Sequence, residues 1–169
     1  GLRVKANAST AFGNAIVVLM KSITAVGNFG TGTDDLISQT MVASVLNVNG
    51  DTIVWEGFGT TTNSADTKQV DVLIGGTNVV SSGALMISVA WDWRLRVRYV
   101  RTGATTQDVF ATFSATSSAG VLVEVENFST TGHTLSGAVI FKCTGTAGAA
   151  AANNVIVQEE SELDFHPMP

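Results

Sequence analysis

The sequence predicts an all-β fold, and three observations support this. First, 22 valines, 8 isoleucines and 21 threonines make 51 of the 169 residues β-branched, about 30%; such side chains lose rotamer freedom on a helix and pack well on a pleated sheet. Second, apolar and polar residues alternate along several segments, which is the period of a half-buried strand. Third, clusters of turn-forming residues separate these segments roughly every eight to fifteen residues, a spacing typical of a sandwich or a barrel.

The clearest strand covers residues 91–99, because apolar side chains there alternate strictly with charged ones. The apolar face carries Trp91, Trp93, Leu95, Val97 and Tyr99, and the charged face carries Asp92, Arg94, Arg96 and Arg98. Taken in chain order, the expected strands cover residues 15–23, 36–48, 53–58, 70–74, 91–99, 109–113, 121–126, 139–143 and 155–157.

Turn formers occupy residues 49–51, 75–78, 81–83, 102–103, 117–120 and 130–132, where Gly, Asn and Ser tolerate positive φ or bond to their own backbone. The two prolines, Pro167 and Pro169, lie at the C-terminal end and demote no strand. No repeat or linker divides the chain. We therefore expect one antiparallel domain, residues 1–169, with about eight to ten strands.

Composition excludes several classes of function. The chain has 9 basic and 14 acidic residues, a formal net charge of −5, so a strongly basic nucleic-acid-binding face is not expected. No apolar run approaches the ~20 residues of a membrane helix, so membrane insertion is not expected. The single cysteine, Cys143, excludes an internal disulfide; between apolar strand residues it resembles a small buried hydrophobe.

Motifs for enzyme chemistry are missing from the sequence. There is no nucleophile elbow, no metalloprotease helix motif and no phosphate-binding loop. The two histidines, His133 and His166, fall in a turn and near the C-terminus, and we expect both to be solvated loop residues. The sequence therefore predicts a protein that is not an enzyme, with no catalytic residue, no cofactor and no metal site.

The acidic cluster Glu159, Glu160, Glu162 and Asp164 is the strongest local charge feature. Carboxylates so close together could serve glycoside hydrolysis or bind calcium. The simpler interpretation, which we favour, is a solvated edge of the last strand, where charge discourages aggregation between sheets.

Three arginines, Arg94, Arg96 and Arg98, share one face of the strand over residues 91–99. Guanidinium groups about 7 Å apart repel one another unless they are partnered. We expect a structural ion-pair ladder, with Glu124 and Glu126 or carboxylates of a neighbouring subunit as partners. The functional alternative is a site for a sugar acid or a phosphate, which arginine binds in bidentate fashion.

Three tryptophans, Trp55, Trp91 and Trp93, would form a carbohydrate platform if they were exposed. Because aromatic residues at alternating strand positions usually face inward, we expect these three in the core or in a subunit interface.

Several segments resemble jelly-roll modules of structural proteins of tailed bacteriophages, among tail-fibre and tailspike modules and head-decoration proteins. The resemblance spans about residues 40–166 and is carried by short strand-and-turn segments: Asn-Gly-Asp-Thr-Ile at 49–53, residues 67–77, residues 93–107, residues 134–146 and residues 153–158. It implies a two-sheet jelly roll, commonly a homotrimer on the virion surface, and it carries over no active site. Residues 1–35 match less well and would form an N-terminal attachment segment.

This resemblance, with the low charge of the chain, predicts a trimeric, surface-displayed module of a phage tail appendage, a fibre or a spike. Its partners would be two further copies of itself, other virion proteins and a host surface glycan or receptor. The first alternative is a capsid decoration protein that stabilises the head. The second is a carbohydrate-binding module or a glycan-active enzyme.

Binding residues are expected in the loops, which cluster at the two ends of the sandwich and do not have to pack the core. Contact with host or shell is expected through one end of the trimer. In the loop over residues 59–66 the candidates are Thr60, Thr61, Thr62 and Asn63. In the loop over residues 129–134 they are Thr130, Thr131 and His133. Neither loop holds a large aromatic side chain, apart from Phe128 at a margin, so affinity per subunit should be low and depend on threefold avidity.

Overall fold

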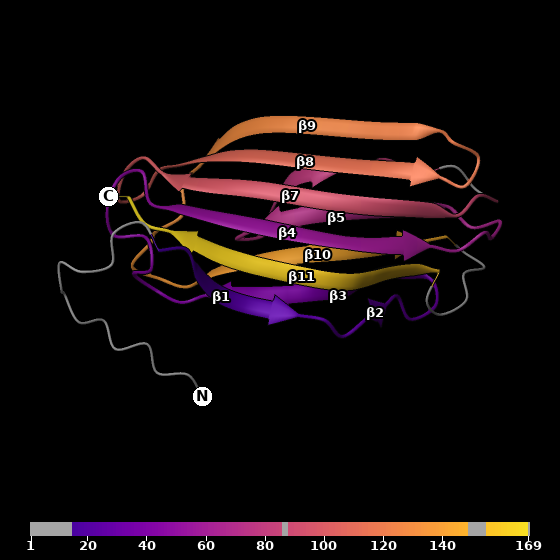
Figure 1. Cartoon of the computed structure of the whole chain (residues 1–169), viewed down its shortest axis with the longest axis horizontal. Helices are drawn as coiled ribbons and strands as arrows, with labels where there is room; N and C mark the ends of the chain where they lie inside the picture. Colours follow the sequence, from indigo (N-terminus) through magenta and orange to yellow (C-terminus); the bar gives the residue numbers. More distant parts are fainter. Residues whose placement is uncertain (1–14, 86–87, 149–154, 169) are drawn as a thin grey trace.

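A computed structural model describes residues 15–85, 88–148 and 155–168. These residues form eleven strands in two antiparallel sheets and contain no helix (Figure 1). The large sheet has the order β1 (Val17–Ser22), β11 (Ile156–His166), β4 (Thr52–Thr61), β7 (Trp91–Arg101), β8 (Gln107–Ser117) and β9 (Leu122–Thr131), and β2 (Val26–Gly27) also pairs with β11. The small sheet has the order β3 (Gly32–Met41), β10 (Val139–Ala147), β5 (Lys68–Ile74) and β6 (Thr77–Ser81).

The strand order is that of a jelly roll, which confirms the predicted fold class. The large sheet contains the run β1-β11-β4-β7, and the small sheet has the order β3-β10-β5-β6. This interleaving of early and late strands is the product of two Greek keys. The hairpin of β8 and β9 extends the large sheet beyond β7, so the large sheet is wider than the small one (Figure 1). No helix in the described ranges is long and apolar enough to cross a membrane.

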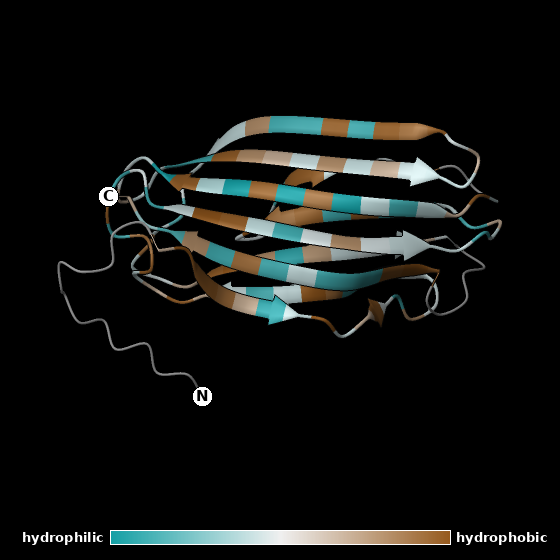
Figure 2. Cartoon of the chain, in the orientation of Figure 1, coloured by the Kyte–Doolittle hydropathy of each residue, from teal (hydrophilic) through white to brown (hydrophobic). Residues whose placement is uncertain are grey.

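The core lies between the two sheets and is built by the alternation seen in the sequence. Along β7 the side chains are buried and exposed in turn, and bands of opposite hydropathy alternate along the strands of the large sheet (Figure 2). Trp55, Trp91 and Trp93 are at most 1% exposed. Trp55 meets Phe141 of the small sheet edge to face, with ring centroids 5.9 Å apart. The core interpretation of these tryptophans is confirmed, and they form no carbohydrate platform.

A polar group lies inside this core. The Trp55 indole N–H donates to Ser161 Oγ at 2.7 Å, and Ser161 Oγ donates to Gln39 Oε1 at 3.4 Å. Cys143 is also fully buried, which confirms that it acts as a small hydrophobe; burial raises the pKa of its thiol.

Two expectations about strands are wrong. The strand expected over residues 36–48 is β3, which covers Gly32–Met41 instead. The Asp51 carboxylate accepts hydrogen bonds from the backbone N–H groups of Asn47 and Val48, both at 2.8 Å, and so holds the residues before it as a loop. The last strand is not an edge: β11 runs to His166 and lies between β1 and β4. The outer strands of the large sheet are β1 and β9.

The expected N-terminal attachment segment, residues 1–35, is described only from residue 15 onward. Within it, β1 and β2 pair with β11 of the large sheet, and the first residues of β3 pair with β10 of the small sheet. Two strands that the sequence did not predict are β2 and β6, both of which are short.

Candidate binding surface

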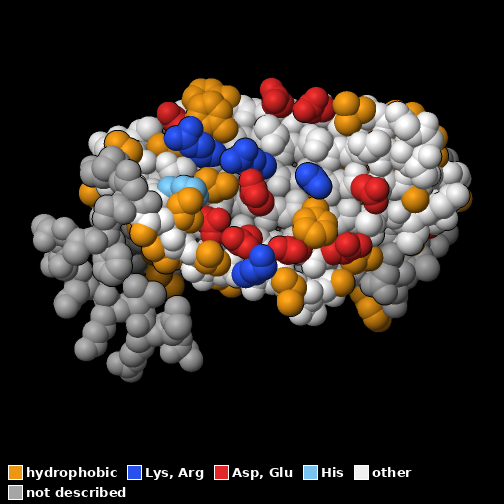
Figure 3. Space-filling model, in the orientation of Figure 1, with side chains coloured by type: hydrophobic (Ala, Val, Ile, Leu, Met, Phe, Trp, Pro, Cys, Tyr) orange, Lys and Arg blue, Asp and Glu red, His pale blue; other side chains and the backbone are white. Residues whose placement is uncertain are grey.

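The outer face of the large sheet, the face turned away from the small sheet, carries its side chains in cross-strand rows. Directly opposed residues of an antiparallel pair place their Cβ atoms about 4.5–5.5 Å apart, so each row forms a continuous band. The strand register gives one row of Glu162, Glu56, Arg96, Thr112 and Glu126, and a second row of Glu160, Phe58, Arg94, Ser114 and Glu124. Charged side chains of both signs gather across the middle of this face (Figure 3).

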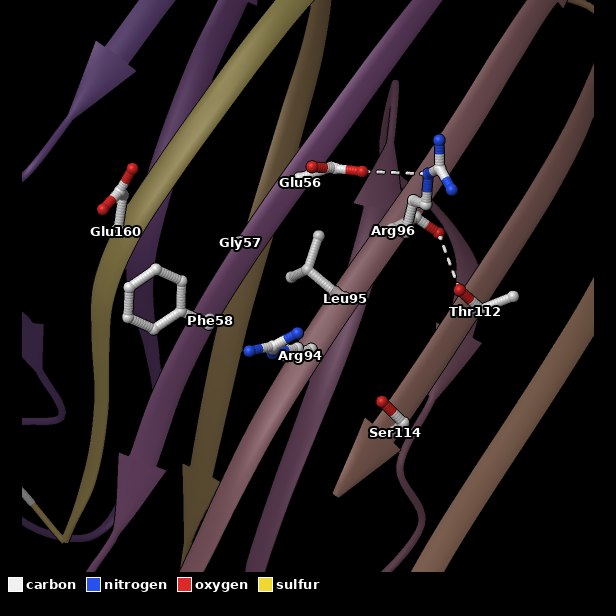
Figure 4. A pocket seen from close by; sticks show the side chains of 9 residues that line it. All are labelled: Glu56, Gly57, Phe58, Arg94, Leu95, Arg96, Thr112, Ser114 and Glu160. Carbon is white, nitrogen blue, oxygen red and sulfur yellow. Dashed lines mark hydrogen bonds and ion pairs between the residues drawn. The ribbon is translucent and has the colours of Figure 1, made fainter. Parts of the chain in front are cut away.

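A groove follows β7 on this face, between β4 and β8. It consists of two adjoining hollows of about 400 and 570 Å³, which share Phe58, Arg94 and Ser114. We call the two together the outer groove; its polar and aromatic side chains are Glu56, Phe58, Thr60, Asp92, Arg94, Arg96, Thr112, Ser114, Thr116, Glu159 and Glu160. The ring of Phe58 lies on the β11 side of the groove and Arg94 extends toward it from β7 (Figure 4).

The floor of the outer groove is close-packed backbone. Gly59 faces the core, where a Cβ atom would overlap the carbonyl oxygen of Val157 and lie 2.5 Å from the Trp93 ring. Glycine at this position therefore lets β4, β11 and the Trp93 indole approach one another, which keeps the floor of the groove flat.

The ion pairs of this face differ from the predicted ladder. Arg96 Nε lies 2.9 Å from Glu56 Oε1, and both side chains are more than half exposed. The predicted partners Glu124 and Glu126 are on β9, two strands from β7 and thus roughly 10 Å away across the sheet, because β8 lies between them. Among the described residues, Arg96 therefore pairs with Glu56 rather than with Glu124 or Glu126, and pairing of these arginines with carboxylates of a neighbouring subunit stays a prediction.

Arg94 and Arg98 form no ion pair with any residue that the structure describes. Both are exposed on the outer face, and of the two only Arg94 lines the outer groove. The Glu160 carboxylate, which also lines the groove, is held by Lys21 Nζ at 2.9 Å.

The two ends of the outer groove hold different charged side chains. One end holds the guanidinium group of Arg96 and the carboxylates of Glu56 and Glu160, with the hydroxyl of Thr112, and Arg94 and Ser114 line both hollows. The other end holds two carboxylates, Asp92 and Glu159.

Glu159 reaches the acidic end because β11 has a bulge between Gln158 and Glu160, which adds one residue to this strand. Its Oε1 accepts a hydrogen bond from Thr60 Oγ1 at 3.1 Å. The acidic end therefore has two carboxylates beside the hydroxyls of Thr60 and Thr116, and Arg94 is the arginine nearest to them in the lining of the groove.

The predicted contact residues of the first loop lie at one end of β4. Thr60 and Thr61 belong to the strand itself; Thr60 lines the outer groove, and Thr61 is buried, with its Oγ1 accepting from the Trp91 backbone N–H at 3.1 Å. Thr62 and Asn63 are exposed beyond the end of the strand.

Those of the second loop are also partly in a strand. Thr130 and Thr131 end β9: Thr130 is exposed and donates to Asp108 Oδ1 at 3.2 Å, whereas Thr131 is buried. His133 is half-buried rather than a solvated loop residue, and its Nδ1 lies 3.0 Å from the Tyr99 hydroxyl. Desolvation lowers the pKa of His133, and a hydrogen bond to the backbone of Ile74 opposes this.

The two predicted loops lie at opposite ends of the sandwich. Thr61 pairs with Trp91, at the start of β7, whereas Thr131 pairs with Gln107, which in turn pairs with Arg101 at the end of β7. The two loops therefore cannot both belong to one contact end, and contact through one end of the trimer stays a prediction. The other histidine, His166, is not in a loop, since it is the last residue of β11.

The structure adds residues that the sequence reasoning missed, above all Phe58 and Ser114. Neither stands in a motif, and only the pairing of three strands brings them to either side of Arg94. In the described parts of the chain, no group of three or more His, Cys, Asp or Glu residues is arranged to hold a metal ion.

No protein-family model and no curated protein matches this chain. Among solved structures, it is similar to a peanut lectin with a 9mer peptide, at 9% identity over 92% of this chain and 100% of that chain, with a TM-score of 0.41. It is also similar to the CBM2 module of the evolved Dit of Lactobacillus casei BL23 phage J-1, at 12% identity over 78% of this chain and 69% of that chain, with a TM-score of 0.36. A third similar structure is the CBM36-1 domain of a multidomain xylanase from the hindgut metagenome of Trinervitermes trinervoides. The identity is 14% over 93% of this chain and 99% of that chain, with a TM-score of 0.33.

Proposed function

We propose that this jelly roll is a non-enzymatic contact module that binds a saccharide in the outer groove. The observation that carries the proposal is the groove along β7. In it the Phe58 side chain, which is 40% exposed, lies beside guanidinium, hydroxyl and carboxylate groups. A sugar ring has an apolar face of C–H groups, which suits an exposed aromatic ring, and a rim of hydroxyls that both donate and accept hydrogen bonds.

The proposal is tested by blocking the groove. Ser114→Trp places a bulky side chain between β7 and β8, and Thr40→Trp, on an exposed position of the small sheet, is the matched control. On a glycan array, wild type and Thr40→Trp should bind the same saccharides, and Ser114→Trp should lose at least about tenfold in affinity. Equal binding by the blocked variant, or no binding by wild type, would overturn the proposal, provided that far-ultraviolet circular dichroism shows both variants folded.

We further propose that the module belongs to a tail appendage of a bacteriophage virion, as its sequence resemblance implies, and that it assembles as a homotrimer. The exposed apolar side chains along β1 and β2, among them Val18, Met20 and Val26, support association, because apolar surface of this kind is typical of interfaces. Light scattering should give a mass three times the 17.5 kDa of one chain. A stable monomer at micromolar concentration would contradict the trimer.

Gold-labelled antibody on intact particles tests the setting. Label at the tail is the expected result, and label spread over the head would instead support the capsid decoration role. The absence of catalysis is tested by incubating the bound saccharide with the protein and assaying for new reducing ends; their release would show a glycan-active enzyme.

A further inference from the structure

We infer that the saccharide of the outer groove carries an anionic group, and that Arg94 binds this group. The inference rests on the proposed function and adds the ligand class. It starts from a charge imbalance: Arg96 is held by Glu56 at 2.9 Å and Glu160 by Lys21 at 2.9 Å, whereas the Arg94 guanidinium has no carboxylate partner among the described residues. An exposed guanidinium that lines a groove is a strong site for a carboxylate, sulfate or phosphate, since it presents paired N–H donors.

The neighbours of Arg94 complete a place for such a group. On the strand register, Phe58 of β4 and Ser114 of β8 lie directly on either side of it. The Ser114 hydroxyl can donate a further hydrogen bond to an anionic oxygen, and the Phe58 ring can cover the apolar face of the sugar that bears it. Glu56 and Glu160 also line this end of the groove, but each already forms an ion pair with a basic side chain, Arg96 and Lys21 respectively.

The opposite end of the groove fixes the direction of the ligand. Asp92 lies two residues before Arg94 on β7, and its carboxylate and that of Glu159 are acceptors beside the hydroxyls of Thr60 and Thr116. A second anionic group would be repelled there, whereas neutral ring hydroxyls can donate to these carboxylates. The geometry therefore favours a saccharide with its anionic group at Arg94 and uncharged rings toward Asp92.

The test compares acidic glycans with their neutral parents. An array should carry uronic acid, sialylated, sulfated and phosphorylated saccharides, each beside the same saccharide without its acidic group, so that it also separates carboxylate from sulfate and phosphate. Isothermal titration calorimetry of the best pair then uses wild type, Arg94→Gln and Arg98→Gln. Arg98 is the matched control, because it is an exposed arginine on the same strand and face that is also without an ion pair but lies outside the groove.

We expect wild type and Arg98→Gln to prefer the acidic member by about tenfold or more, and Arg94→Gln to lose this preference, with the preference weakening as salt is added. If wild type binds the acidic saccharide and its neutral parent equally, and Ser114→Trp abolishes both, this inference is overturned and the proposed function still stands. Binding of no member would overturn both. A change of oligomeric mass in Arg94→Gln would show that Arg94 binds a carboxylate of another copy instead, which would also overturn the inference.

Discussion

Replacing Ser161 with alanine removes the acceptor of the Trp55 indole N–H in the middle of the core. Both residues are at most 1% exposed, and their hydrogen bond is 2.7 Å long, so no water can replace the lost hydroxyl without opening the sandwich. A buried donor left without an acceptor costs about 1–3 kcal/mol, and we expect Ser161→Ala to lower the free energy of unfolding by about 2 kcal/mol. For a chain of this size that corresponds to a fall in Tm of about 4–8 °C.

A double-mutant cycle with Trp55→Phe shows whether the hydrogen bond is responsible. Phenylalanine keeps an aromatic ring beside Phe141 but has no N–H, so in that background Ser161→Ala should cost less than about 0.5 kcal/mol. The long contact of Ser161 with Gln39, 3.4 Å, contributes little to this difference. Urea unfolding followed by far-ultraviolet circular dichroism measures all four proteins without relying on tryptophan fluorescence. An equal loss in both backgrounds would refute the reasoning, since it would mean that Ser161 acts through packing alone.

Three further predictions concern the floor of the groove, the pH dependence and the surface ion pair. Gly59→Ala should destabilise the fold by about 3 kcal/mol because its Cβ overlaps backbone, whereas Gly132→Ala, whose Cβ has its closest contact at 3.8 Å, should change stability by less than about 0.5 kcal/mol in urea unfolding. Because burial lowers the folded-state pKa of His133, the unfolded chain binds more protons below about pH 6.5, so stability should fall from pH 7 to pH 5; His133→Gln should reduce that slope, and an unchanged slope would assign it to other groups. Arg96→Ala should lower stability by no more than about 0.5 kcal/mol, because its pair with Glu56 is solvated, and a loss of several kcal/mol would contradict this.

The sequence predicts which residues of one strand share the exposed face of the candidate site, but it does not predict which residues of the neighbouring strands lie beside them. Alternation predicts that Arg94, Arg96 and Arg98 share one exposed face, where they form either an ion-pair ladder or a site for a sugar acid or a phosphate. What the alternation cannot supply is the neighbour on each side of the strand. Glu56 comes from β4 and the hydroxyl row from β8, and both follow from strand order and register, which are set by contacts between distant parts of the chain.

The position of the two contact loops in the sandwich also could not be predicted from the sequence. The sequence predicts loops over residues 59–66 and 129–134, and both segments lie at strand ends, although Thr60, Thr61, Thr130 and Thr131 still belong to the strands. Local sequence does not state which end of the sandwich each loop occupies. That depends on the direction of β4 and β9 in the large sheet, and these two strands run in opposite directions because β7 and β8 lie between them.

By itself the sequence determined the fold class, the inward tryptophans, the buried cysteine and the outward arginines. All of these follow from local period and from the partition of apolar side chains away from water, which each segment expresses on its own. Only the tertiary structure decided that β11 is an inner strand, that Arg96 pairs with Glu56, that His133 contacts Tyr99, and that the outer groove exists. The reason is physical: hydrogen bonds between strands are made by backbone groups that are alike at every residue, so the choice of neighbour is made by the packing of the whole sandwich.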